Sequence, residues 1–100
     1  MLSAEVIIEN IEKKMGKIRE YGVKKIGLFG SYLRNEQKDD SDIDILVEFE
    51  KGQKTFDNYM DLKFFLEDLF EYKVDLVIMD AIKPDLKPYI LGSVKFAAAT

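Results

Sequence analysis

Two aspartates, Asp42 and Asp44, are the residues of this 100-residue chain whose spacing most directly suggests chemistry. Side chains two positions apart on a β-strand leave the same face, so both carboxylates can converge on one cation. Without a cation each raises the pKa of the other, whereas Mg²⁺ and Mn²⁺ prefer such oxygen ligands. The other interpretation is a solvated turn over residues 40–42, which accounts for Asp42 but leaves Asp44 inside an apolar run unexplained. The pair predicts a metal site.

A Gly-Ser pair, Gly30 and Ser31, lies ten residues before these acids and directly after an apolar run. A turn that opens a helix offers free backbone N–H groups to an anion such as phosphate. Arg34 follows one helical turn later and could add a planar cation. No Gly-Lys-Ser/Thr follows, so this is not a P-loop. An ordinary strand-to-helix turn and an exposed surface arginine remain the alternatives. Taken with the acids, the turn predicts a site for a metal-bound nucleotide.

Asp75 is the third candidate, because it interrupts an otherwise apolar run over residues 74–79. We expect a buried position, and buried acids are rare unless they are paired, hydrogen-bonded or metal-bound. The alternative is a structural salt bridge to one of three nearby lysines, Lys24, Lys25 or Lys73.

The composition excludes several other chemistries. The chain has no Cys and no His, which removes His-dependent nucleophilic triads, Cys/His zinc sites and disulfides. A calcium loop beginning at Asp40 also fails, because its sixth position is Ile45 rather than Gly and its twelfth is Lys51 rather than Glu. Catalysis would have to use carboxylates, hydroxyls and basic side chains.

Length and charge limit the class of protein. An apolar fraction of 47% and a charged fraction of 34% are typical of a folded domain, so we expect a single domain over residues 1–100. A net charge of -4 argues against direct nucleic-acid binding and favours a basic protein partner. No secretory signal or membrane-spanning run is recognisable, so we expect a cytoplasmic protein.

Apolar periodicity and turn residues predict an α/β domain with a small sheet flanked by helices. Ser3 is the expected N-cap of the first helix and Gly22 its stop. The strand over 74–79 is so apolar that we expect it to be central or covered on both faces. The final residues, 97–100, carry no structural signal. The expected elements are helices over 2–21, 31–35, 56–70 and 89–96, and strands over 24–29, 43–49 and 74–79.

The combined pattern of Gly-Ser, ten residues, Asp-x-Asp and a later lone Asp resembles the polymerase-beta nucleotidyltransferase superfamily. At this length the chain is similar to the minimal nucleotidyltransferases, which are often antitoxin partners of HEPN ribonuclease toxins. The specific part of the resemblance covers residues 29–47 together with Asp75. One departure is Asn35, where the family often has Gly.

The resemblance implies a polymerase-beta-like nucleotidyltransferase fold with a small mixed sheet. It implies that Gly30, Ser31 and Arg34 bind the triphosphate of ATP. It further implies that Asp42 and Asp44 hold two Mg²⁺ ions, or Mn²⁺, and that Asp75 helps bind metal and activates the acceptor.

The activity implied is transfer of AMP from ATP to a hydroxyl, expected to be a Tyr, of a cognate HEPN toxin, with this chain as the antitoxin. Two alternatives are an antitoxin that neutralises its partner by binding alone and a transferase that modifies a small molecule.

Overall fold

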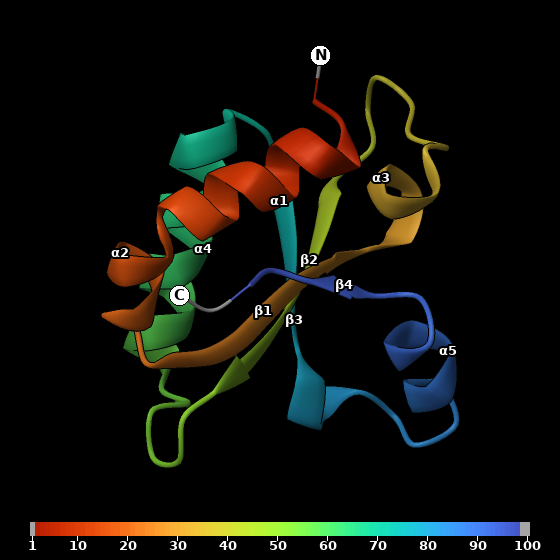
Figure 1. The fold of residues 1–100 in the computed structure, drawn as a ribbon. Coiled ribbons are helices and arrows are strands. Elements are labelled where there is room, and N and C mark those ends of the chain that lie inside the picture. The colour runs from red at the N-terminus through yellow and green to blue at the C-terminus, as the bar shows by residue number, and fades with distance from the viewer. Residues whose placement is uncertain (1, 99–100) are drawn as a thin grey trace.

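The computed structural model describes residues 2–98, which form a four-stranded mixed sheet in the order β3-β2-β1-β4 (Figure 1). Strand β1 pairs antiparallel with β2 and with β4, and β2 pairs parallel with β3. The helix α4 is the crossover that joins the two parallel strands. The elements are α1 (Ala4–Lys13), α2 (Met15–Arg19), β1 (Val23–Phe29), α3 (Gly30–Arg34), β2 (Ile43–Phe49), α4 (Phe56–Phe70), β3 (Val74–Ile78), the 3₁₀-helix η1 (Met79–Ala81), α5 (Lys87–Leu91) and β4 (Lys95–Phe96).

The N-terminal helix is divided into two, so the prediction of one continuous helix over 2–21 was wrong. The chain leaves helical geometry at Lys14, where φ is -103° and ψ is 13°, and Gly16, a poor helix former, follows two residues later. The predicted ends are confirmed: the Ser3 Oγ accepts a 3.2 Å hydrogen bond from the Val6 N–H, and Gly22 adopts a φ of +81°. The break leaves the apolar stripe intact.

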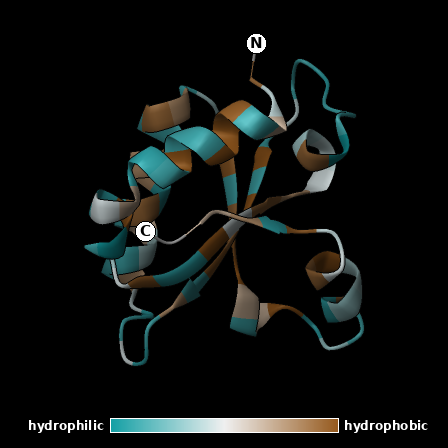
Figure 2. Cartoon of the chain, in the orientation of Figure 1, coloured by the Kyte–Doolittle hydropathy of each residue, from teal (hydrophilic) through white to brown (hydrophobic). Residues whose placement is uncertain are grey.

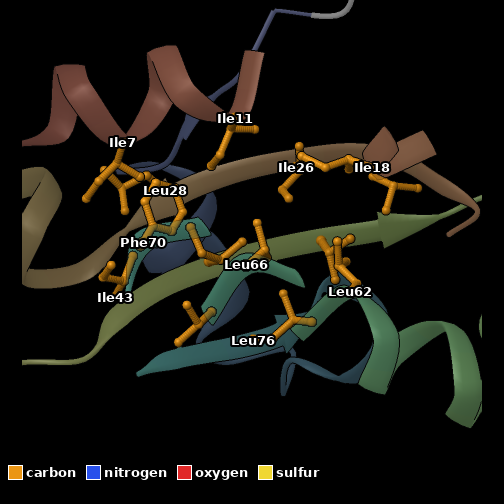
Figure 3. Packing of buried hydrophobic residues seen from close by; sticks show 14 of the residues in the cluster. Ile7, Ile11, Ile18, Ile26, Leu28, Ile43, Leu62, Leu66, Phe70 and Leu76 are labelled. Carbon is orange, nitrogen blue, oxygen red and sulfur yellow. The ribbon is translucent and has the colours of Figure 1, made fainter. Parts of the chain in front are cut away.

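The main core lies on one face of the sheet, beneath α1, α2 and α4. Figure 3 shows Ile7 and Ile11 of α1 pointing toward strand side chains such as Leu28, with Leu62 and Leu66 of α4 completing the layer. In Figure 2 helix α1 alternates between hydrophilic and hydrophobic residues, as expected of a helix with one buried side. These helices therefore hold three of the strands from a single side.

The last two strands in the sequence differ from expectation. Strand β3 lies at the edge of the sheet and its Asp75 is exposed, so the prediction of a strand that is central or covered on both faces was wrong. Its apolar residues are explained by burial on one face, where Val74 and Leu76 are 2% and 3% exposed. The predicted helix over 89–96 was also wrong: α5 ends at Leu91, and β4 instead pairs with β1 through Gly27 and Leu28.

The C-terminal residues are anchored as far as Ala98. The Ala97 N–H donates to the Ile26 carbonyl at 2.9 Å, and the Ala98 N–H donates to the Glu12 carboxylate at 2.7 Å. As the sequence indicated, neither residue belongs to a helix or strand, although both are held by backbone hydrogen bonds. Positions 99 and 100 lie outside the described residues.

Candidate active site

The predicted site residues meet at one end of the sheet, where β1 ends and β2 and β3 begin (Figure 1). Asp44 pairs in register with Phe29 on one side and with Asp75 on the other. Gly30 directly follows Phe29, and Asp42 directly precedes β2. Residues from three separate segments are thus placed side by side by strand register alone.

The Gly30 turn lies directly against the Asp44 carboxylate. Gly30 has a φ of +77°, a conformation that favours glycine, and a Cβ at this position would overlap Asp44 Oδ2. The Ser31 backbone N–H faces the same carboxylate and acts to lower its pKa. The first turn of α3 therefore directs the Ser31 backbone donor at the negative charge of Asp44.

The pKa of Asp44 is nevertheless raised above its ordinary value. Burial is the largest cause, followed by the negative charges of Asp75 and Asp42, and together they outweigh the opposing effects of Ser31 and Arg34. Between residues 2 and 98 no lysine or arginine forms an ion pair with any of the three aspartates. The salt bridge considered for Asp75 is thus not formed.

These carboxylates fit a hard divalent cation in donor chemistry and in charge, since a cation would relieve the repulsion that raises the Asp44 pKa. Within the described part of the chain, the side chains do not form a closed group of three ligands around one point. Asp75 is exposed rather than buried, so that prediction was wrong. Asp75 lies on the face of β3 opposite to the buried Val74 and Leu76, which leaves its carboxylate accessible.

Arg34 is a surface residue in this structure. Its Nε donates to Glu36 Oε2 at 3.2 Å, and about half of the side chain is exposed. Exposed pairs of this kind contribute only about 0–1 kcal/mol, so a phosphate could replace Glu36 at low cost. Asn35 closes α3 with a φ of 58°, and Asn is among the few non-glycine residues that adopt this left-handed conformation readily. Asn35 thus keeps the turn that Gly would provide.

The acidic loop before β2 is a real turn, but Ser41 rather than Asp42 makes its hydrogen bonds. Ser41 Oγ accepts from the Lys38 N–H at 2.8 Å, and the Ser41 N–H donates to the Lys38 carbonyl at 3.0 Å. Asp42 is exposed. Capping of this turn therefore does not account for the aspartate at position 42.

A hollow of about 300 Å³ opens beside Asp42, and sequence reasoning did not find it. The side chain of Tyr72 forms one wall and is 44% exposed. Four acids within residues 39–44 were a visible sequence signal for one side of the hollow, whereas Tyr72 and Lys73 join it only because β3 starts beside β2. The hollow is lined by Asp39, Asp40, Ser41, Asp42, Tyr72 and Lys73.

The described region contains no helix that is both long and apolar enough to cross a bilayer. This result agrees with the sequence, in which no apolar run of that length is present.

Comparison with known proteins identifies the same type of domain. A model of the nucleotidyltransferase domain matches residues 8–97. The protein adenylyltransferase MntA of Thermococcus cleftensis is 38% identical over 97 residues, covering 96% of this chain and 97% of that protein. A Methanocaldococcus jannaschii relative, named as a candidate protein adenylyltransferase, is 48% identical over 90 residues and covers 88% of each chain.

Solved structures agree with this assignment. A candidate minimal nucleotidyltransferase superposes with a TM-score of 0.81 at 31% identity, covering 94% of this chain and 95% of the other. A chain from the complex of a tri-AMPylated Shewanella oneidensis HEPN toxin with its MNT antitoxin gives a TM-score of 0.64 at 25% identity, covering 93% and 73%. The expected fold is confirmed, and the chain belongs to the nucleotidyltransferase domain family and is a minimal nucleotidyltransferase.

Proposed function

We propose that this enzyme transfers AMP from ATP to the hydroxyl of a tyrosine on a HEPN-type toxin and so acts as the antitoxin of that protein. The observation that carries the proposal is the placement of the Gly30 turn, Asp44 and Asp75 side by side at one sheet end. Relatives named protein adenylyltransferase and structural neighbours in HEPN–MNT complexes support this choice of acceptor. A site in the cytoplasm, where ATP is available, is consistent with the proposal.

Each proposed residue has a chemical role that its position allows. Asp42, Asp44 and Asp75 would hold Mg²⁺, as two ions, with Mn²⁺ as a substitute. When bound, Mg²⁺ supplies neutralisation of the negative charge that develops on the transferred phosphorus. The backbone N–H groups of the Gly30 turn, with the Ser31 hydroxyl and the Arg34 guanidinium, would bind the triphosphate.

The exposed carboxylate of Asp75 is the group best placed to orient the acceptor hydroxyl and accept its proton. The acceptor oxygen forms a bond to the α-phosphorus of ATP as the bond to the β-phosphate oxygen breaks, and pyrophosphate leaves. No histidine is required for this chemistry, and the chain has none.

The test is mass spectrometry of the cognate HEPN protein after incubation with this chain, ATP and Mg²⁺. We expect the partner to gain one or more AMP units, and we expect Asp42→Asn with Asp44→Asn to abolish the gain. Asp61→Asn, an exposed acid on α4, is the matched control and should transfer normally. An unmodified partner, or equal modification by the double variant, would refute the proposal.

The same variants separate the two alternatives when ribonuclease inhibition and AMP transfer to small hydroxyl compounds are also measured. If the double variant neutralises the HEPN ribonuclease at equimolar amounts without any AMP transfer, neutralisation by binding alone would be supported. If AMP appears only on a small hydroxyl compound, the small-molecule transferase would be supported instead.

A further inference from the structure

Asp75 lies on an edge strand, which normally leaves every second backbone group without a partner. Within residues 2–98 strand β3 pairs only with β2, and that pairing uses the backbone of residues such as Lys73, whose carbonyl accepts from the Ile43 N–H at 3.0 Å. The alternate residues Val74 and Leu76 therefore direct their backbone groups away from the sheet. These two residues flank Asp75 in the sequence.

Helix α4 provides partners for both flanking residues. The carboxylate of Glu67 accepts a 3.1 Å hydrogen bond from the Val74 N–H. The hydroxyl of Tyr59 donates a 2.7 Å hydrogen bond to the Leu76 carbonyl. Both α4 side chains are partly buried, so water competes weakly for these bonds. Two side chains of one helix thus fix the main chain immediately before and after Asp75.

We propose that Glu67 and Tyr59 are positioning residues for Asp75, an inference that rests on the proposed function of Asp75. The Asp75 side chain is exposed and forms no ion pair within residues 2–98, so its location depends on the backbone that carries it. A metal ligand or proton acceptor must be held to within a fraction of an ångström to work well. The two hydrogen bonds from α4 supply this restraint on the open side of β3.

The side of β3 that faces β2 shows why the hydrogen bonds from α4 are needed. Register pairing places Asp75 beside Asp44 on the neighbouring strand, so two carboxylates lie next to each other. The two carboxylates therefore repel each other while no cation is bound. Fixing the backbone on the outer side of the strand keeps Asp75 beside Asp44 despite that repulsion.

The variants that test the proposal change the hydrogen bonds and little else. Glu67→Ala removes the acceptor, Glu67→Gln keeps an acceptor oxygen, and Tyr59→Phe removes only the hydroxyl. Asp68→Asn, an exposed acid next to Glu67 on α4, is the matched control. Three quantities are measured for each variant: amide exchange at Val74, Mn²⁺ affinity, and kcat and KM for ATP in AMP transfer.

We expect Glu67→Ala to speed amide exchange at Val74, to weaken Mn²⁺ binding and to lower kcat, each by about tenfold, as is typical when a supporting contact to a metal site is lost. KM for ATP should change less than kcat, because the Gly30 turn is untouched. Glu67→Gln should restore most of the loss, Tyr59→Phe should lower kcat to a smaller extent, and Asp68→Asn should match the wild type.

Two results would overturn the positioning role. One is a Glu67→Ala protein that binds Mn²⁺ as tightly as the wild type, and the other is a Glu67→Gln protein that is no better than Glu67→Ala. Because Mn²⁺ affinity and amide exchange are measured without ATP or partner, an inactive wild-type protein would count against the proposed function alone.

Discussion

The two faces of strand β2 have opposite roles. On one face Ile43, Ile45 and Val47 are completely buried beneath the helices. On the other face Asp44 lies partly buried beside Asp75, and its pKa is raised by burial and by like charge. One strand therefore stabilises the fold with one set of alternating residues and assembles mutually repelling acids with the other set.

The contrast is confined to the beginning of the strand. Leu46 shares a face with Asp44 but is completely buried, and the 3₁₀-helix η1 is in contact with β2. Gly27, opposite Leu46, also leaves room for β4, since an added Cβ would meet Val94 and Phe96. Asp42 and Asp75 are exposed and Asp44 is partly buried, whereas Leu46, further along the same face of β2, is covered. This difference can be tested from both faces of the strand.

The largest effect on stability is expected on the covered face. Ile45→Ala should lower the free energy of unfolding by about 2–5 kcal/mol, because it leaves a cavity in a fully buried layer. Urea unfolding measures the loss. A decrease of less than about 1 kcal/mol would mean that this face does not carry the stability that its burial indicates.

Gly30 lies against Asp44 at the start of α3, and Gly30→Ala should lower both stability and AMP transfer. The added Cβ would overlap Asp44 Oδ2, and the backbone φ of +77° is strained for alanine. We expect a loss of about 1–3 kcal/mol in unfolding free energy and a loss of AMP transfer.

Gly16→Ala is the matched control for this change. Gly16 lies in α2 with no atom within 4 Å of an added Cβ, so alanine there should stabilise the protein by about 0.5–1 kcal/mol and leave transfer unchanged. Equal behaviour of the two variants would contradict the close contact between Gly30 and Asp44.

A smaller effect is expected from pH and metal on the acid face. Because folding raises the Asp44 pKa above its ordinary value of 3.8, the folded state binds this proton more tightly than the unfolded chain. Without divalent cations, the stability contributed by protonated Asp44 should be present below pH 3.8 and lost as the pH rises through the raised pKa. Adding Mg²⁺ at neutral pH should then raise the melting temperature.

Thermal unfolding across this pH range, with EDTA or with Mg²⁺, measures both effects. Asp44→Asn should reduce the pH dependence and the gain from Mg²⁺ together. A wild-type protein that becomes more stable as the pH rises through the same window would contradict the sign of this coupling.

Most of the fold could be predicted because its signals are local. The alternation in 43–49 and the apolar stripe in 56–70 each reproduce an observed element. The errors occur where a distant partner decides the structure: no other strand of the described residues pairs with the outer edge of β3, and β4 is a strand because it pairs with the edge of β1. Neither fact is encoded in the local period of the sequence.

The candidate site also combines features that are local in the sequence with features that depend on distant partners. Gly30, Asp42 and Asp44 could be proposed from spacing within one short segment, and strand register places Asp75 beside them. The exposure of Asp75 depends on which face of β3 the helices cover, and the position of Tyr72 in the neighbouring hollow depends on the pairing of β3 with β2. The hydrogen bond from the Val74 N–H to Glu67 depends on how α4 packs against the sheet, and no short-range pattern could have indicated it.

The most direct test of the division between the two faces is a paired measurement on Asp44→Asn. In one assay AMP transfer to the HEPN-type partner is followed, and in the other the melting temperature is determined in EDTA at neutral pH. We predict that transfer falls by at least about a hundredfold while the melting temperature stays the same or rises. A variant that retains transfer, or one that loses activity only because it unfolds more easily, would contradict this account.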